Sequence, residues 1–384
     1  MMRKLESLIR KRVSDYRLFK IMCFFPVKRN RIFFQSFRTP GFTDNPQYLC
    51  RALYEMCNDR LEYICAFDNN DQSAEVPYVK MAQYRSLLWL YYLATSKTVV
   101  WNNFTPLWLT RRKGQLIINT WHAGGAFKRT GLYRISADES KAEQQINQYI
   151  NLFSSSSQIF TEFNIIEGWH YHGEILKCGM PRNDIFFSQE DVRKSSDKIR
   201  KHFGLGDSLC VLFAPTYRGN GEKTIDMIPP LGEVREVLQK KTGRTVSILL
   251  RRHRRDKNHY VVSEAIYDVS SYPDAQELLC CADILITDYS SIIWDYALLA
   301  RPCFLFVPDK NEYETNRGLF TPIEDWPGII CRDRNELLQE IIEMDEKRSQ
   351  EIAKRYLEKA GSYENGNAAK VLAKRIGQHM AVQM

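Results

Sequence analysis

The 384-residue chain contains no long uninterrupted apolar segment. Its longest apolar stretches, such as residues 87–94, are far shorter than the roughly 20 residues that a membrane-spanning helix needs. The N-terminal region also lacks the long apolar core and the small-residue cleavage site of a signal peptide. These absences predict a chain that neither crosses a bilayer nor carries a secretion signal.

The ten cysteines are irregularly spaced and include no Cys-x-x-Cys pair, so neither a zinc site nor a secreted disulfide framework is expected. This usage favours a reduced, intracellular chain. The sequence contains no cluster of acidic residues of the kind that binds Mg²⁺ beside phosphate groups. We therefore expect no metal and no cofactor.

The composition favours a globular protein with substantial cores. Hydrophobic residues make up 44% of the chain and aromatic residues 12%, which argues against disorder. The length suits two domains. The 54 Lys and Arg residues against 46 Asp and Glu residues give a net charge of +8, which favours anionic partners.

Basic and apolar residues alternate over residues 1–30. This pattern is typical of an amphipathic helix that lies on an anionic leaflet, and it predicts a peripheral protein at the cytoplasmic face of the cell membrane. The alternative is a solvated helix packed on its own domain. The basic residues among the first 31 are Arg3, Lys4, Arg10, Lys11, Arg12, Arg17, Lys20, Lys28, Arg29 and Arg31.

The rest of the chain alternates between strand and helix patterns, which predicts an α/β protein with parallel sheets covered by helices. Two series of comparable size predict two Rossmann-like domains, residues 31–189 and 190–384, whose sheets face a central cleft. Strands are expected at 31–37, 61–67, 97–102, 115–120, 152–155, 174–177, 209–214, 246–250, 265–268, 283–287 and 303–307. Helices are expected at 46–57, 86–95, 139–150, 160–169, 190–203, 231–242, 275–281, 291–300 and 336–359.

One segment predicts an anion site directly. The apolar run 284–287 ends in Asp288-Tyr289-Ser290-Ser291, which opens the next helix. The first amides of a helix have no partner within it, and the two serines add donors, so a phosphate is the ligand expected there. Asp295 follows Ser291 by four residues and faces the same side. Simple helix capping by Ser and Asp is the alternative.

A second segment supplies a base. His122, at the end of strand 115–120, can accept a proton near neutral pH, and Gly124 and Gly125 allow a tight turn that brings amides close to a ligand. Lys128 follows within reach of a phosphate. A lone histidine at a strand end is more often a satisfied core residue, but the glycine pair and the basic tail favour function.

Basic residues follow the carboxyl ends of three further predicted strands. Open α/β sheets bind their ligands at these ends. The basic residues are Arg182 in Gly179-Met180-Pro181-Arg182, Arg218 in Ala214-Pro215-Thr216-Tyr217-Arg218, and the run from Arg251 to Arg255, which includes Arg252 and His253. A solvated loop would also explain the last run. Arginine binds phosphate in a bidentate manner, and histidine can hold or protonate a leaving phosphate oxygen.

Taken in order, these motifs resemble the CDP-glycerol glycerophosphotransferase family of bacterial enzymes, which build teichoic acids and related capsular polymers. Arg317-Gly318 and Pro327-Gly328 match the family as well. The resemblance runs from about Arg31 to the last helix, nearly the whole chain.

The resemblance implies a GT-B-type fold and a CDP-glycerol or CDP-ribitol donor. It also implies an acceptor hydroxyl on a lipid-linked glycan or polyol phosphate chain, release of CMP, and no nucleic-acid partner. His122 would be the general base, and His253 a second catalytic residue. The substrate-binding positions would be Ala123, Gly124, Gly125, Ala126, Lys128, Arg182, Pro215, Thr216, Arg218, Arg251, Arg252, Ser290, Ser291 and Asp295.

The chain departs from the family at one loop. The family usually reads His-Gly-Thr-Pro, whereas this sequence reads His122-Ala123-Gly124-Gly125. Because the hydroxyl and the stiff proline are missing, we expect a more mobile loop and different contacts with the donor polyol.

Two other functions fit the same residues. A GT-B glycosyltransferase would share the fold and the diphosphate site, but it would form a glycosidic bond from a nucleotide sugar. A non-catalytic protein could bind polyanions through its basic segments by counterion release, which needs no base, so His122→Ala would leave it intact.

Overall fold

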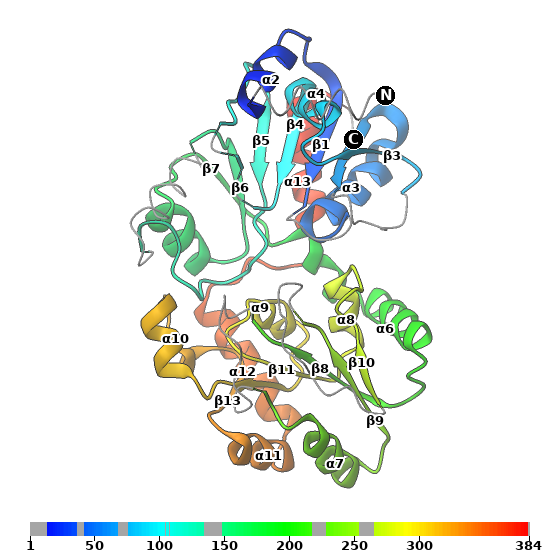
Figure 1. Ribbon diagram of the computed structural model, residues 1–384, viewed down its shortest axis with the longest axis vertical. Helices are drawn as coiled ribbons and strands as arrows, with labels where there is room; N and C mark the ends of the chain where they lie inside the picture. Colours follow the sequence, from blue (N-terminus) through cyan, green and yellow to red (C-terminus); the bar gives the residue numbers. More distant parts are fainter. Residues whose placement is uncertain are drawn as a thin grey trace. The chain divides into compact units, whose positions relative to one another are not determined.

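The computed structural model describes residues 14–36, 42–67, 76–103, 105–106, 108–133, 148–216, 228–252 and 265–382. The chain divides into two units, each built on a parallel sheet (Figure 1). Unit 1 comprises Met1–His122, Thr130–Asp184 and Tyr363–Met384. Unit 2 comprises Ala123–Arg129 and Ile185–Ser362.

The sheet of unit 1 has seven strands in the order β3-β2-β1-β4-β5-β6-β7, and the paired strands are parallel. All four residues of β5 are buried, as expected for an inner strand covered on both faces. The strands are β1 (Lys28–Gln35), β2 (Glu62–Phe67), β3 (Val79–Gln83), β4 (Ser96–Trp101), β5 (Leu116–Asn119), β6 (Leu152–Ser155) and β7 (Glu174–Lys177).

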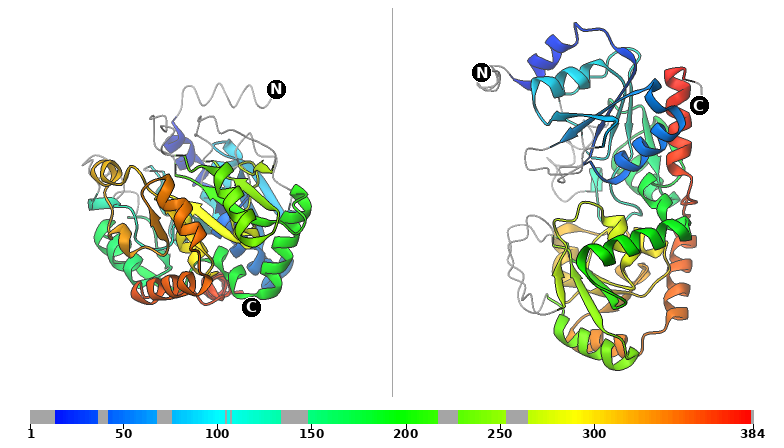
Figure 2. Two further views of the ribbon diagram at one scale, coloured as in Figure 1. Left: turned by 90° about the horizontal axis from the view of Figure 1, so that it is seen from below. Right: turned by 90° about the vertical axis from the view of Figure 1, so that its right-hand side faces the viewer.

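Helices cover this sheet, and the last helix of the chain is one of them. Leu372 and Ile376 of α13 lie in the same buried cluster as Leu49 and Leu53 of α3, and Figure 2 shows the two helices side by side. The helical segments are α2 (Asp15–Met22), α3 (Asp44–Cys57), η1 (Asn58–Arg60), α4 (Leu87–Thr95), η2 (Gly131–Tyr133), the π-helical η3 (Phe160–Gly168), η4 (Pro181–Phe187) and α13 (Ala368–Met380).

The sheet of unit 2 has six strands in the order β10-β9-β8-β11-β12-β13, also with parallel pairs. Its centre is apolar: β8 and β9 are buried along their whole length. The strands are β8 (Leu209–Ala214), β9 (Val246–Leu250), β10 (Ile266–Asp268), β11 (Ile284–Thr287), β12 (Cys303–Phe306) and β13 (Ile329–Cys331).

The helices of unit 2 complete the α/β layers. Val234 and Leu238 of α7 and Leu337 and Ile341 of α11 pack in the core of the sheet. The helical segments are α6 (Gln189–Phe203), α7 (Leu231–Thr242), α8 (Ala275–Cys281), α9 (Ile292–Ala297), α10 (Lys310–Arg317), η6 (Ile323–Asp325), α11 (Arg334–Ile342) and α12 (Glu346–Lys359).

The division of the chain differs from the predicted boundaries of 31–189 and 190–384. Residues 363–384 belong to unit 1 because the apolar face of α13 is buried in the unit 1 core. The carboxylate of Asp184 accepts the amides of Ala368 and Ala369 at 2.9 and 2.8 Å, which fixes the start of α13. Residues 123–129 belong to unit 2.

Several predicted elements also need correction. The single helix expected at 336–359 is two helices, because the carboxylate of Asp345 accepts the amide of Lys347 and caps α12. The helix expected at 291–300 is the shorter α9. The predictions missed β3, β13, α10 and α13. Most of the helix expected at 139–150 lies outside the described residues.

Two findings bear on the expectations about membranes and cysteines. In the part of the chain that the structure describes, no helix is long and apolar enough to cross a membrane. All ten cysteines are free thiols, and all but Cys23 are buried.

Candidate functional site

In unit 1 the candidate base lies just beyond β5. The side chain of Asn119 accepts the amide of Trp121 at 2.8 Å, and Trp121 adopts the left-handed region with φ +51°. His122 follows, half-buried, and its Nδ1 lies 2.8 Å from the carbonyl oxygen of Asn102. A carbonyl can only accept, so Nδ1 carries a proton, and in the neutral ring Nε2 then carries the lone pair. This is the tautomer that a general base acting through Nε2 requires.

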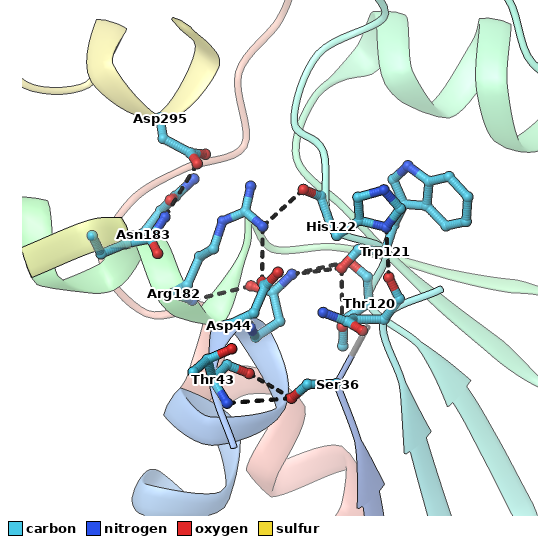
Figure 3. A network of polar contacts seen from close by, with 12 residues as sticks. Ser36, Thr43, Asp44, Thr120, Trp121, His122, Arg182, Asn183 and Asp295 are labelled. Carbon is cyan, nitrogen blue, oxygen red and sulfur yellow. Dashed lines mark hydrogen bonds and ion pairs between the residues drawn. The ribbon is translucent and has the colours of Figure 1, made fainter. Parts of the chain in front are cut away.

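Arg182, predicted to bind the donor, is buried and engaged within unit 1. Its Nη1 donates to the Asp44 carboxylate at 2.8 Å and to the His122 carbonyl at 2.9 Å. The side chain of Asn45 donates to the carbonyls of Trp121 and Thr120 at 2.8 and 3.3 Å. Figure 3 shows this network around the His122 turn.

The loop 123–129 packs within unit 2. Gly124, Gly125 and Ala126 are buried, and Gly125 has φ +64°. A Cβ atom on Gly124 would lie 1.9 Å from Cδ1 of Trp294 in α9, so only glycine allows this approach. Lys128, further along, forms a backbone bridge with Leu319, and its ammonium lies 5.8 Å from the ring centroid of Tyr313. Ala123, at the start of the loop, is half-buried.

The end of β8 brings together two polar residues. After Pro215, the amide of Thr216 donates to the carboxylate of Asp288 at 2.8 Å, which ties the end of β8 to the end of β11. The hydroxyl of Thr216 is buried and has no hydrogen-bond partner among the described residues. A buried hydroxyl with unused capacity suits a ligand oxygen.

The two arginines that follow β9 differ. The guanidinium of Arg251 donates to the carbonyl of Tyr272 at 2.7 Å, and burial lowers its pKa despite the nearby charge of Asp274. The guanidinium of Arg252 pairs with Asp268 on β10. Burial alone would raise the pKa of Asp268, but the bonds from Ser270 and Arg252 outweigh it and lower the pKa. Arg252 therefore stabilises the β9–β10 edge.

The serine motif lies at the start of α9. The hydroxyl of Ser290 is 3.4 Å from the amide of Ile292, a weak cap, and Ser291 makes no side-chain cap bond. Asp295 is buried, and its carboxylate accepts a hydrogen bond from the side-chain Nε2 of Gln276 at 3.1 Å. Because α9 has only six residues, it has no long helix dipole. An anion at its start would bind to the backbone amides of its first turn.

Two predicted site residues, Arg218 and His253, lie outside the described residues. Sequence reasoning missed Asp44 and Asn45, which stabilise the His122 turn in unit 1, and Trp294, which contacts the loop 123–129 in unit 2. The signal for the first two was an Asp-Asn pair before Pro46 at the start of a helix. The residues that the structure describes include no group of three or more His, Cys, Asp or Glu side chains arranged to hold a metal ion.

The chain has two Rossmann-like units, each with polar or basic residues at the carboxyl ends of its parallel strands, and these are the components of a GT-B-type protein. A solved structure of the wall teichoic acid polymerase TagF confirms that fold class: it superimposes with a TM-score of 0.84 at 25% identity, over 99% of this chain and 97% of that chain. The model of the CDP-glycerol:poly(glycerophosphate) glycerophosphotransferase family matches residues 17–378, so the chain belongs to this family.

Two relatives are 28–29% identical to the chain over the residues that align. The teichoic acid poly(glycerol phosphate) polymerase of Staphylococcus epidermidis is 29% identical, over 93% of this chain and 52% of that protein. The teichoic acid ribitol-phosphate primase of Bacillus spizizenii is 28% identical, over 86% of this chain and 88% of that protein. The chain therefore spans about half the length of the Staphylococcus epidermidis polymerase.

Proposed function

We propose that the protein transfers a polyol phosphate, most naturally glycerol phosphate, from a CDP-activated donor to a hydroxyl of a lipid-linked glycan or polyol phosphate acceptor. CMP is released, and the product belongs to a teichoic acid or a capsular polymer. Family membership supports the reaction class. The relatives named for glycerol phosphate and ribitol phosphate support both polyols as donor candidates.

The observation that carries this proposal is the bond between His122 Nδ1 and the Asn102 carbonyl. It places the lone pair on Nε2, which removes the proton from the acceptor hydroxyl. The oxygen attacks the phosphorus that bears the polyol, the bond from this phosphorus to the bridging oxygen breaks, and CMP leaves with the electron pair. Phosphoryl transfer of this kind depends mainly on positioning and charge stabilisation.

In this proposal unit 2 binds the donor diphosphate. Arg251 supplies a positive charge, Thr216 a buried hydroxyl, and the Ser290-Ser291 turn amides and hydroxyls. His253 and Arg218 join them by family resemblance alone. These groups can neutralise a diphosphate without a metal ion.

The test uses the purified full chain with CDP-glycerol, CDP-ribitol and UDP-hexoses in turn, together with a lipid-like acceptor. We expect CMP release from one CDP-polyol, its loss in His122→Ala, and its retention in the matched control His172→Ala, which changes an exposed histidine of the same unit. UDP release alone would move the protein to the glycosyltransferases. No release from any donor would overturn the proposal.

We also propose that the protein works as a peripheral protein at the cytoplasmic face of the membrane. Leu18 and Phe19 of α2 are buried, whereas Phe24, just beyond the helix, is 90% exposed. The other exposed apolar and basic residues near this helix end are Ile21, Phe25, Lys20, Lys28 and Arg29. Exposed aromatic side chains beside basic ones suit the interface of an anionic leaflet, where a lipid-linked acceptor would be found.

A further inference from the structure

We propose that Asn45 is a positioning residue for the general base: its side-chain amide fixes the turn that presents His122. This inference rests on the proposed role of His122. Asn45 does not touch the reacting atoms in this scheme; it acts through the backbone of residues 120–122.

The side chain of Asn45 uses its hydrogen-bonding groups on two separate segments. It is fully buried, and its Nδ2 donates to the carbonyls of Trp121 and Thr120 at 2.8 and 3.3 Å. Its Oδ1 accepts the amide of Arg182 at 3.1 Å. One residue in the first turn of α3 thus connects the turn after β5 with the segment that carries Arg182.

The turn needs such a partner because its conformation is unfavourable by itself. Trp121 has φ +51°, a region that bulky residues rarely adopt. If Asn45 were removed, the buried carbonyl oxygens of Thr120 and Trp121 would lose the hydrogen bonds that its Nδ2 donates. The rings of Trp121 and His122 lie against each other with centroids 4.5 Å apart, so a change at Trp121 moves the imidazole directly.

The neighbouring residue, Asp44, provides a second constraint on the turn. The Asp44 carboxylate accepts Nη1 of Arg182 at 2.8 Å and the amide of Asn45 at 2.6 Å. The same Nη1 donates to the carbonyl of His122 at 2.9 Å. Asp44 and Asn45 therefore fix consecutive carbonyls of the turn, Asn45 directly and Asp44 through Arg182 (Figure 3).

The isosteric variant Asn45→Asp tests this role. Aspartate has the size of asparagine and keeps an oxygen that accepts the Arg182 amide. Its other oxygen replaces the donating Nδ2 and therefore faces the carbonyl oxygens of Thr120 and Trp121. We expect kcat for CMP release to fall by roughly 10- to 100-fold, because misplacing a catalytic group by about an ångström has effects of that size. The donor KM should change little. Asn30→Asp, on an exposed position of β1, is the matched control and should retain wild-type kcat.

A second readout does not depend on activity. In protein labelled with ¹⁵N-histidine, the His122 ring signals, assigned by their loss in His122→Gln, report which nitrogen carries the proton. We expect the Nδ1–H form in the wild type and in Asn30→Asp, and a mixture of tautomers in Asn45→Asp. A merely structural role for Asn45 would lower the melting temperature and leave the tautomer unchanged.

These readouts separate the two proposals. If the wild type transfers no polyol phosphate, the proposed function fails, and the tautomer comparison still decides the role of Asn45. Wild-type kcat and tautomer in folded Asn45→Asp would overturn the inference. If Asn45→Asp does not fold, Asn45→Ser decides instead, because the single short hydroxyl of serine cannot bind both the turn after β5 and the Arg182 amide. We expect the same loss of kcat there, and wild-type values in both measurements would overturn the inference.

Discussion

Gly124 and the indole ring of Trp294 are in direct contact, and no side chain could fit between them: a Cβ atom on Gly124 would lie 1.9 Å from Trp294 Cδ1. A Cβ atom on Gly125 would lie 2.9 Å from Cε3 of the same ring. Trp294 is fully buried in α9, four residues after Ser290. The packing argues against the greater mobility that the lost Thr and Pro predicted for this loop.

The first prediction follows from this contact. Gly124→Ala should lower the free energy of unfolding by about 1–3 kcal/mol, because the added methyl group must displace a buried indole. It should also slow CMP release, since α9 carries Asp295 and follows the serine turn. Urea unfolding and the release assay measure the two effects. Adding Trp294→Leu to Gly124→Ala should recover part of the lost stability, because the smaller side chain makes room for the methyl group.

Gly232→Ala is the matched control for this prediction. A Cβ atom at Gly232, in the first turn of α7, would meet nothing within 4 Å. Alanine is the better helix former, so this variant should be as stable as the wild type or slightly more stable. If Gly124→Ala unfolds at the same urea concentration as Gly232→Ala, Trp294 does not constrain the loop.

The layer architecture could be predicted from the sequence because buried parallel strands are nearly continuous apolar runs, as in 209–214 and, with one serine, 246–250. The return of α13 to unit 1 could not. Helical periodicity shows that Ala368, Leu372 and Ile376 share an apolar face, but it does not say which sheet that face covers. Likewise, the break at Asp345 depends on one capping bond inside a long helical pattern.

For the candidate site, strand ends were the informative signal. They singled out His122, which follows β5 in unit 1, and Thr216 and Arg251, which follow β8 and β9 in unit 2, because ligands bind at the carboxyl ends of parallel strands. Hydrogen-bond partners were not predictable, because they come from residues far apart in the sequence. Asn45 lies 76 positions before Trp121, the residue whose carbonyl it binds.

The second prediction separates the two arginines after β9. Arg251→Gln should raise the donor KM at least tenfold with little change in stability, because among the described residues its guanidinium makes one hydrogen bond and retains other donors. Arg252→Gln should mainly lower stability, because it leaves Asp268 without its cation. Donor titrations and urea unfolding of both variants test this. Equal effects of the two substitutions on KM would contradict it.

The third prediction concerns Glu62, which pairs with the buried Arg31 at 2.7 Å. Burial alone would raise the pKa of Glu62, but Arg31 and Lys80 outweigh it and lower the pKa to about 2. A carboxylate with a lowered pKa in the folded state stabilises the fold above its ordinary pKa near 4.5, and this contribution is lost as the pH falls toward 2. Over that range the wild type should lose up to about 3 kcal/mol.

Glu62→Gln should abolish this dependence. The variant should be less stable than the wild type at pH 7, because it leaves Arg31 buried without its partner, and the difference should shrink between pH 4.5 and 2. Glu190→Gln removes an exposed carboxylate paired with Lys194 and should show little effect at any pH. A pH-independent difference between Glu62→Gln and the wild type would show that folding does not lower the pKa of Glu62, and so would contradict the prediction.

The fourth prediction concerns divalent ions. If basic groups and turn amides neutralise the donor diphosphate, CMP release should continue in EDTA at close to its rate in buffer. The assay should be run on chain that has been dialysed against the chelator and then given Mg²⁺. Loss of turnover in EDTA that Mg²⁺ restores would show that a cation binds with the donor.

The last prediction concerns the surface at Phe24. Exchanging both Phe24 and Phe25 for serine should reduce sedimentation with vesicles that contain anionic lipid, because burial of these rings at the interface would be lost. Leu132→Ser, which changes an exposed apolar residue in η2 instead, is the matched control and should sediment like the wild type. The binding should weaken with salt and be smaller on zwitterionic vesicles, since Lys20, Lys28 and Arg29 interact with anionic head groups. Equal sedimentation of the double serine variant and the wild type would leave this surface without a role in membrane binding.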